Sequence, residues 1–334
     1  MHKISGKLIS LIMTAALLIA LTGCMGTDYS LESTDRNTRT SASSESTGTY
    51  VRMEFDTAKY PYYAMLSETE KNAYSLIYEE LSKGSQKFEC KVLVTADQLS
   101  KAIDSVLNDH PELFWLDNNY GYTYDPSGGN IRELTFTFFD FADTPEKLEA
   151  ARAEFSRAAD SITAQALTFS SVTDRELFIH DYICQNTEYD ADAPYNQSAY
   201  SVLVTHKSVC AGYARCFQYL MQKTGATCYY VTGRTEGTGG QVVGGSNSDG
   251  SHSWNMLLIN GVYCNVDCLW DDTASDTYGS AIYPFFNLPD GDFVNHARIE
   301  MAVNLPACTT SEYKYSNQFG PTIEASSIIF ADAG

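Results

Sequence analysis

The pattern of apolar and polar positions between residues 50 and 143 predicts helices followed by strands. A capping box begins at Ser67 and a second at Thr95, and each precedes an apolar stripe with helical spacing. Apolar and polar residues then alternate through 120–124 and again through 131–139, which is typical of two paired strands. We therefore expect an N-terminal α+β region over 50–143.

Three tyrosines, Tyr120, Tyr122 and Tyr124, would point to one face of the first of these strands. They would either line a substrate groove, a carbohydrate-binding face included, or pack the sheet against the helices. We favour packing, because aromatic side chains are common on half-buried sheet faces.

Three helices are expected next along the chain. One is predicted over about 145–167 with Pro at its first position, and a capping box at Thr173 begins another. The third covers 211–223, with Ser208 as its predicted N-cap and Gly225 as the residue that ends it.

A β-hairpin is predicted around Asn260-Gly261, which separates the apolar runs 254–259 and 262–267. Asn-Gly between two such runs is the strongest short-range signal for a two-residue type I′ turn. Because this turn has a fixed length, it also fixes which residues of the two strands face each other.

Counting back from the turn places Trp254 opposite Asp267, with His252 diagonal to Asp267 on the same face. Diagonal cross-strand neighbours are about 7–8 Å apart at Cα, within reach of long side chains. An imidazole would therefore meet a carboxylate, whereas a register slip of one residue would put them on opposite faces.

Cys210 lies in the first turn of the helix predicted over 211–223. Unpaired N–H groups and the positive end of the helix dipole favour a thiolate there, and the thiolate is the nucleophilic form of cysteine. Together with His252 and Asp267 it would supply a nucleophile, a base and a group that orients the base.

These residues stand in three motifs that resemble those of the transglutaminase-like superfamily. The motifs are Val-Cys-x-Gly-Tyr-Ala at 209–214, His-x-Trp-Asn at 252–255 and Asp-x-x-Trp-Asp at 267–271. The resemblance covers roughly 173–272, and the order of the three motifs makes it specific.

The resemblance implies an α+β fold with a papain-like core, in which a Cys at a helix N-terminus faces His and Asp on an antiparallel sheet. It also implies acyl transfer through a thioester, with Cys210 as nucleophile, His252 as base and acid, and Asp267 as the orienting residue. The N-terminal region would be an α/β elaboration of that core.

The first residues predict export. A short basic region precedes the apolar run 8–21, and Leu-Thr-Gly-Cys at 21–24 resembles a bacterial lipobox. The implied events are cleavage before Cys24 and lipidation of its sulfur; the alternative is an ordinary secretory signal. The run is shorter than the 18 to 20 residues of a membrane-spanning helix.

Four regions follow from these signals: a signal peptide at 1–23, a flexible Ser/Thr-rich tether at 24–49, the α+β region at 50–143 and a transglutaminase-like domain at 144–334. The chain carries 42 acidic and 22 basic residues. Loss of a signal with two lysines and no acids would change the net charge from −20 to −22. Such a charge argues against nucleic acid as a partner.

Nine cysteines leave the disulfide pattern open. With Cys24 assigned to lipid and Cys210 to catalysis, an odd set of seven remains: Cys90, Cys184, Cys216, Cys228, Cys264, Cys268 and Cys308. We do not favour a zinc site at Cys264 and Cys268, because a spacing of four residues is unusual for a pair of zinc ligands and no second pair of cysteines follows. The rival nucleophile, Cys216, lies in mid-helix.

Other candidates are weaker. Tyr200 would either help to bind an oxyanion or simply pack, and no Gln precedes the nucleophile over 202–209 to fill that role. The lone His180 and His206 are expected to be structural or on the surface, and His296 has no predicted partner. The segment 233–251 is a candidate lid or a plain loop, and its glycines do not follow phosphate-loop spacing.

The prediction is therefore a lipoprotein anchored to the outer face of the bacterial membrane, with a thiol peptidase or amidase acting on protein or peptide substrates. The alternatives are a protein cross-linking transglutaminase and a surface binding protein without activity. No metal or organic cofactor is implied.

Overall fold

The computed structural model describes residues 52–125, 130–235 and 250–328. The predicted signal peptide, lipobox and tether lie outside the described residues, as does most of the candidate lid. Within those residues, no helix has the length and apolar character needed to cross a membrane.

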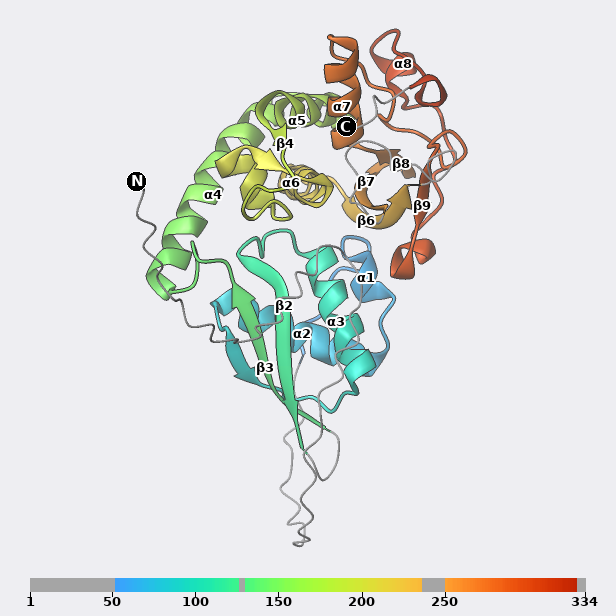
Figure 1. Ribbon diagram of the computed structural model, residues 1–334. Coiled ribbons are helices and arrows are strands. Elements are labelled where there is room, and N and C mark those ends of the chain that lie inside the picture. The colour runs from blue at the N-terminus through green and yellow to red at the C-terminus, as the bar shows by residue number, and fades with distance from the viewer. Residues whose placement is uncertain (1–51, 126–129, 236–249, 329–334) are drawn as a thin grey trace, which may run out of the picture.

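The N-terminal part contains α1 (Pro61–Ala64), α2 (Glu68–Lys83), β1 (Lys87–Glu89), α3 (Ala96–Asp109), β2 (Leu116–Tyr124) and β3 (Ile131–Phe138). The strands form an antiparallel sheet in the order β1-β3-β2, and Figure 1 shows α2 and α3 beside it. Both predicted capping boxes are confirmed: Ser67 and Thr95 are N-caps that accept hydrogen bonds from the helix. No pattern along the chain predicted β1, which is only three residues long.

The tyrosines of β2 mostly pack, as favoured from the sequence. Tyr120 stacks on Phe136 with ring centroids 5.9 Å apart, and Tyr120 and Tyr122 contact the hydrophobic core. Only Tyr124 is largely exposed among the three, at 44%. The packing role therefore accounts for most of this aromatic face.

The second part continues with α4 (Pro145–Ala166), α5 (Val172–Asn186), β4 (Glu188–Tyr189), the π-helix η1 (Ser201–Thr205), β5 (Lys207–Ser208), α6 (Cys210–Lys223), β6 (Cys228–Thr235), β7 (Ser251–Ile259) and β8 (Val262–Val266). The last elements of the described residues are α7 (Cys268–Tyr278), β9 (His296–Arg298), the 3₁₀ helix η2 (Glu300–Asn304), α8 (Tyr315–Gln318) and η3 (Ala325–Ser327).

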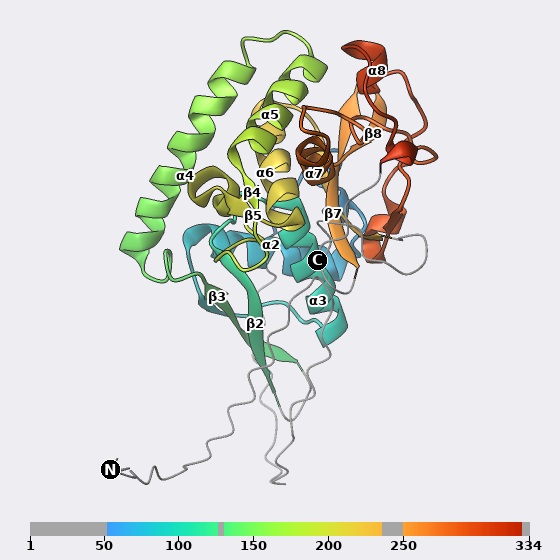
Figure 2. The ribbon, with the colours of Figure 1, turned by 45° about the horizontal axis from the view of Figure 1, so that its top comes forward.

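These elements place α6 between helices and a sheet. The sheet has the strand order β8-β7-β6-β9, and α6 contacts β6 and β7 on one side and α4 and α5 on the other. Figure 2 shows the same layering, with α4 and α5 outside α6. This is the predicted α+β architecture, with a helix N-terminus directed to the end of an antiparallel sheet.

Two predicted helix starts are wrong by one or two residues. α5 begins at Val172, because Ser171 rather than Thr173 is the N-cap and accepts the Asp174 N–H at 3.0 Å. The N-cap of α6 is Val209, and its side chain makes no capping bond.

Ser208 does not cap α6, because its hydroxyl donates to the Asn196 carbonyl at 2.7 Å. It lies equally close to the Ser201 hydroxyl. A Cβ at Gly212 would fall 2.0 Å from the Ser208 oxygen and 2.6 Å from the Asn196 oxygen. Glycine is therefore required in Cys-x-Gly so that the chain before Cys210 can fold back onto the helix.

The predicted hairpin and its register are confirmed. Asn260 and Gly261 have φ of 49° and 89°, as a type I′ turn requires. Ile259 pairs with Val262, and the pairing continues unbroken along both strands to the residues just before Asp267. Gly225, with φ of 86°, follows α6 as predicted.

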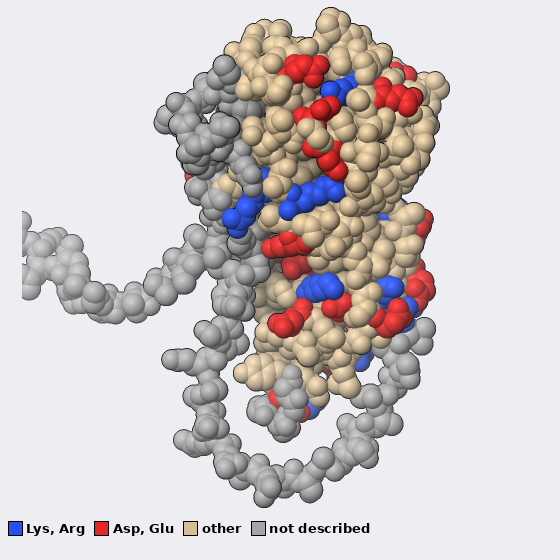
Figure 3. Space-filling view, turned by 90° about the vertical axis from the view of Figure 1, so that its right-hand side faces the viewer, with Lys and Arg blue, Asp and Glu red and all other residues tan. Residues whose placement is uncertain are grey.

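The N-terminal part and the domain that holds Cys210 share one hydrophobic core. Polar bonds also join them: the Tyr62 hydroxyl donates to Tyr230 O at 2.7 Å, and Gln218 Nε2 donates to Asn108 O at 2.9 Å. Figure 3 shows Lys and Arg side chains among the Asp and Glu side chains of one face, so negative charge is not gathered into one patch there.

Candidate active site

Cys210 is the first residue of α6 and is 2% exposed. The free N–H groups and the positive dipole end of the helix are next to its thiol. Tyr189, on β4, is a partly exposed neighbour of Cys210. Burial, and then the negative charge of a Cys210 thiolate, raise the pKa of the Tyr189 phenol. The Cys210 thiol therefore lies at the electropositive N-terminus of α6, close to the partly exposed Tyr189.

His252 lies near the start of β7, and its side chain is fully buried. Its Nε2 donates to Asp267 Oδ2 at 2.5 Å, while its Nδ1 is buried with no hydrogen-bond partner of its own. Burial opposes a charge on the ring, but attraction to Asp267, the hydrogen bond with Asp267 and the nearby Cys210 thiol outweigh it and raise the pKa of His252 to about 10. The free Nδ1 is therefore the atom available to the thiol.

Asp267 joins the end of β8 to the start of α7, and this position occupies both of its carboxylate oxygens. Oδ1 caps α7 by accepting the Trp270 N–H at 3.0 Å, and Oδ2 accepts from His252. Although burial favours the neutral acid, the charge of His252 and the hydrogen bonds from His252 and His296 hold the pKa of Asp267 well below its usual range. Asp267 is therefore a buried carboxylate that is held through both of its oxygens.

His296 is the site residue that the sequence missed. It lies on β9, at the edge of the sheet next to β6, and its Nε2 is 3.0 Å from Asp267 Oδ2. Its Nδ1 is 2.9 Å from the Val294 carbonyl oxygen. No local sequence signal pointed to it, because β9 has three residues and reaches Asp267 only through the fold.

The Asp-x-x-Trp-Asp motif explains how this end of the site is built. The Trp270 ring packs against both imidazoles, with centroids 5.4 Å from His252 and 4.3 Å from His296. Asp271 accepts the Phe285 N–H at 2.7 Å and is 3.1 Å from His180 Nε2. The motif therefore caps α7, packs both histidines and ties α7 to α5.

His180, which was expected to be structural or on the surface, has a carboxylate partner in Asp271. His180 is buried, and its Nδ1 is also 3.8 Å from the Cys184 sulfur. The Glu176 carboxylate nearby accepts from Asn287 Nδ2 at 2.7 Å, and burial raises its pKa to about 8. These residues connect α5, α7 and the C-terminal segment behind Asp267, a structural role.

Other sequence candidates are structural. The Tyr200 hydroxyl donates to Glu154 at 2.8 Å and its ring stacks on Phe141 at 4.1 Å, so it is a packed tyrosine and not an oxyanion donor. Cys216 is fully buried, and burial raises its thiol pKa well above the ordinary value. His206 adopts a left-handed backbone with φ of 59° in the turn before β5.

A metal ion is a competing explanation for His252, Asp267 and His296. Among the described residues they form the group whose ligand atoms, all within 4.8 Å of one another, could hold an ion. Ligand atoms around tetrahedral zinc are about 3.3 Å apart. Asp267 Oδ2 is only 2.5 Å and 3.0 Å from the two imidazole nitrogens, which are hydrogen-bond distances. The arrangement therefore fits shared protons better than a metal.

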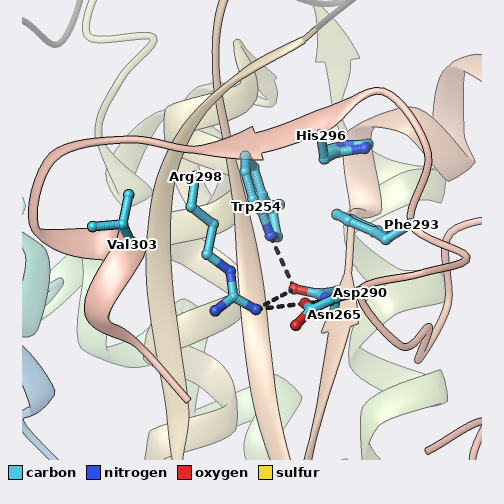
Figure 4. Close-up of a pocket in the computed structure, with 7 residues that line it drawn as sticks. All are labelled: Trp254, Asn265, Asp290, Phe293, His296, Arg298 and Val303. Atoms are coloured by element: carbon cyan, nitrogen blue, oxygen red, sulfur yellow. Dashed lines mark hydrogen bonds and ion pairs between the residues drawn. The ribbon is translucent and has the colours of Figure 1, made fainter. Parts of the chain in front are cut away.

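A pocket of about 290 Å³ adjoins the acid end of this group. Figure 4 shows that Trp254 and Arg298 both reach towards Asn265, and that Arg298 also meets Asp290. The other residues that line the pocket are Phe293, His296 and Val303. His296 is therefore common to the pocket and to the group around Asp267.

Comparison with known proteins finds relatives of the part of the chain that holds this site. Residues 157–268 match the model of the Transglutaminase-like superfamily. Kyphoscoliosis peptidase from Mus musculus is 24% identical over 173 residues, which cover 50% of this chain and 26% of that protein. The Homo sapiens protein of the same name is 25% identical over 173 residues, with the same coverage.

The chain thus spans about a quarter of the length of these curated relatives. Among solved structures, a crystal structure of a TGase has a TM-score of 0.30 and 13% identity, covering 55% of this chain and 50% of that chain. The stretch that matches the Transglutaminase-like superfamily model, residues 157–268, includes Cys210, His252 and Asp267.

Proposed function

We propose that this protein is a thiol enzyme that cleaves amide bonds in proteins or peptides by way of a thioester on Cys210. One observation carries the proposal: a buried imidazole that is held by a carboxylate at Nε2 presents an unpartnered Nδ1 on the side of the Cys210 thiol. A buried polar atom without a hydrogen bond costs free energy, so its presence calls for an explanation. His252 Nδ1 would have such an explanation if it takes a proton from the nucleophile.

In the first half of the reaction, the thiol proton passes to His252 Nδ1 and the Cys210 sulfur attacks the carbonyl carbon of the substrate amide. The C–N bond then breaks, His252 returns the proton to the leaving amine, and the acyl group stays on sulfur as a thioester. Asp267 remains ionised throughout and stabilises the imidazolium.

In the second half, water loses a proton to His252 and attacks the thioester. The C–S bond breaks, the carboxylic acid leaves and the sulfur takes back the proton. An amine in place of water would give a new amide, so the same site supports hydrolysis or transamidation. We propose hydrolysis, because water is the abundant acceptor and because the relatives with this domain are named as peptidases.

The proposal can be tested with denatured protein substrates and mass spectrometry of the products. Wild-type protein should generate new peptide N-termini or deamidated glutamines, and Cys210→Ala should generate neither. Addition of a labelled primary amine distinguishes the acceptor, since incorporation of the label at glutamine would identify a cross-linking enzyme. If products are absent with every substrate and the thiol is unreactive, the alternative of a surface binding protein takes its place.

We also propose that the protein acts outside the cell, held to the membrane by lipid on Cys24. The support is the Leu-Thr-Gly-Cys sequence that follows the apolar run 8–21. Labelled palmitate should enter the protein in cells, and Cys24→Ser should abolish the label and release the protein from the membrane fraction. Labelling that survives the substitution would contradict lipidation at this position.

A further inference from the structure

We infer that His296 is a positioning residue that holds the Asp267 carboxylate in place for His252. This inference rests on the proposed function, because it assigns a role within the same site. It begins from the fact that one carboxylate oxygen, Asp267 Oδ2, meets two imidazole nitrogens, at 2.5 Å from His252 and 3.0 Å from His296.

The direction of these bonds follows from the partners. The carboxylate of Asp267 only accepts hydrogen bonds, so the Nε2 atoms of both histidines donate to it. In the neutral form of His252, Nδ1 then carries no proton and can accept the one that Cys210 gives up. The Nδ1 of His296 faces a carbonyl oxygen, that of Val294, at 2.9 Å.

His296 therefore faces an acceptor at each ring nitrogen, and both contacts are satisfied fully only by the charged ring. Burial works against that charge and lowers the pKa of His296, although the hydrogen bond to Asp267 acts in the opposite direction. In the neutral ring the single proton belongs on Nε2, because a hydrogen bond to a carboxylate is stronger than one to a carbonyl. The bond to Asp267 is therefore present in both states.

The surroundings of His296 fix its ring. Its side chain is fully buried, and its centroid lies 3.9 Å from Phe293, 4.3 Å from Trp270 and 5.0 Å from Trp254. A ring held on several sides keeps its Nε2 aimed at Asp267. Without His296, the Oδ2 atom of Asp267 would have only His252 as a partner, and the geometry of the bond between Asp267 and His252 would loosen.

The inference can be tested without a known substrate, through alkylation of Cys210 by iodoacetamide followed by mass spectrometry over a range of pH. His296→Leu removes both ring nitrogens and keeps an apolar side chain, and we expect alkylation at pH 7 to slow about tenfold, with its midpoint moved to higher pH. His296→Gln keeps an N–H donor for Asp267 and should stay within about threefold of wild type, the rescue expected of a donor role.

Phe293→Leu is the matched packing control, because it keeps an apolar side chain beside His296 and leaves Trp254, Trp270 and the bond to Asp267 to hold the ring. It should react like wild type. The inference is overturned if His296→Leu keeps the wild-type rate and midpoint, if His296→Gln is as slow as His296→Leu, or if Phe293→Leu is as slow as either.

A second readout separates this inference from the proposed function. The proton of the short His252–Asp267 bond should give a far-downfield NMR resonance, whether or not Cys210 reacts. We expect that resonance to persist in His296→Gln and to broaden or disappear in His296→Leu. If wild-type Cys210 proves indifferent to His252→Ala, the proposed function fails; the NMR result still decides whether His296 holds Asp267.

Discussion

Replacement of Asp267 by Asn should deprive the site of its charge while keeping its shape. Asn is as good an N-cap as Asp, so its side-chain oxygen can still accept the Trp270 N–H and begin α7. What is lost is the negative charge that acts on His252. That charge is the main reason that the pKa of His252 is raised from 6.5 to about 10 against the effect of burial.

The size of the effect follows from this shift. Without the carboxylate charge, burial and Cys210 are left to set the pKa of His252, and burial keeps the ring neutral at pH 7. If the pKa of His252 falls by about three, the proton affinity of the ring falls roughly a thousandfold, since one pKa unit is about 1.4 kcal/mol. Part of this is recovered by relaxation, so we expect Cys210 alkylation at pH 7 to fall about a hundredfold.

The assay compares the initial rates of Cys210 alkylation by iodoacetamide in wild type, Asp267→Asn and Asp276→Asn. The last variant makes the same chemical change on an exposed position of α7 and should react like wild type. Circular dichroism and thermal unfolding check that all three are folded. A folded Asp267→Asn protein that reacts at the wild-type rate would refute the idea that this carboxylate supports the imidazole.

Two further predictions concern the frame around the site. Gly212→Ala should lower the free energy of unfolding by about 1–3 kcal/mol in urea titration, because its Cβ meets the Ser208 oxygen at 2.0 Å, whereas Gly291→Ala, with open space around it, should be close to neutral. Glu176→Gln should stabilise the protein more at pH 8 than at pH 5. The pKa of Glu176 is raised from 4.5 to about 8 in the folded protein, so wild type loses stability as the pH rises from about 4.5 towards 8. A Gln that keeps the contact with Asn287 avoids this loss. Equal effects at both pH values would contradict a raised pKa of Glu176.

Local signals in the sequence were enough for the centre of the site. The Asn260-Gly261 turn fixed the strand register, and the register brought His252 to Asp267. A turn of fixed length leaves one pairing, so a short-range rule determined a contact across fifteen residues.

The errors arose where hydrogen bonds from distant or competing residues decided the outcome. Ser208 matches the N-cap preference, but the Asn196 carbonyl takes its hydroxyl, and Ser171 competes with Thr173 for the start of α5. The missed partners are also long-range: His296 reaches Asp267 from a short edge strand. Patterns along the chain do not encode such contacts.

The central claim is that Cys210 and His252 act as a coupled pair, and the pH dependence of Cys210 alkylation in wild type and in His252→Ala tests it most directly. A free thiol titrates near pH 8.5. We predict that wild-type Cys210 reacts well below that pH and that His252→Ala returns it to the behaviour of an ordinary buried thiol. A Cys210 that is unreactive in the folded wild type, or that reacts identically in both proteins, would contradict the account.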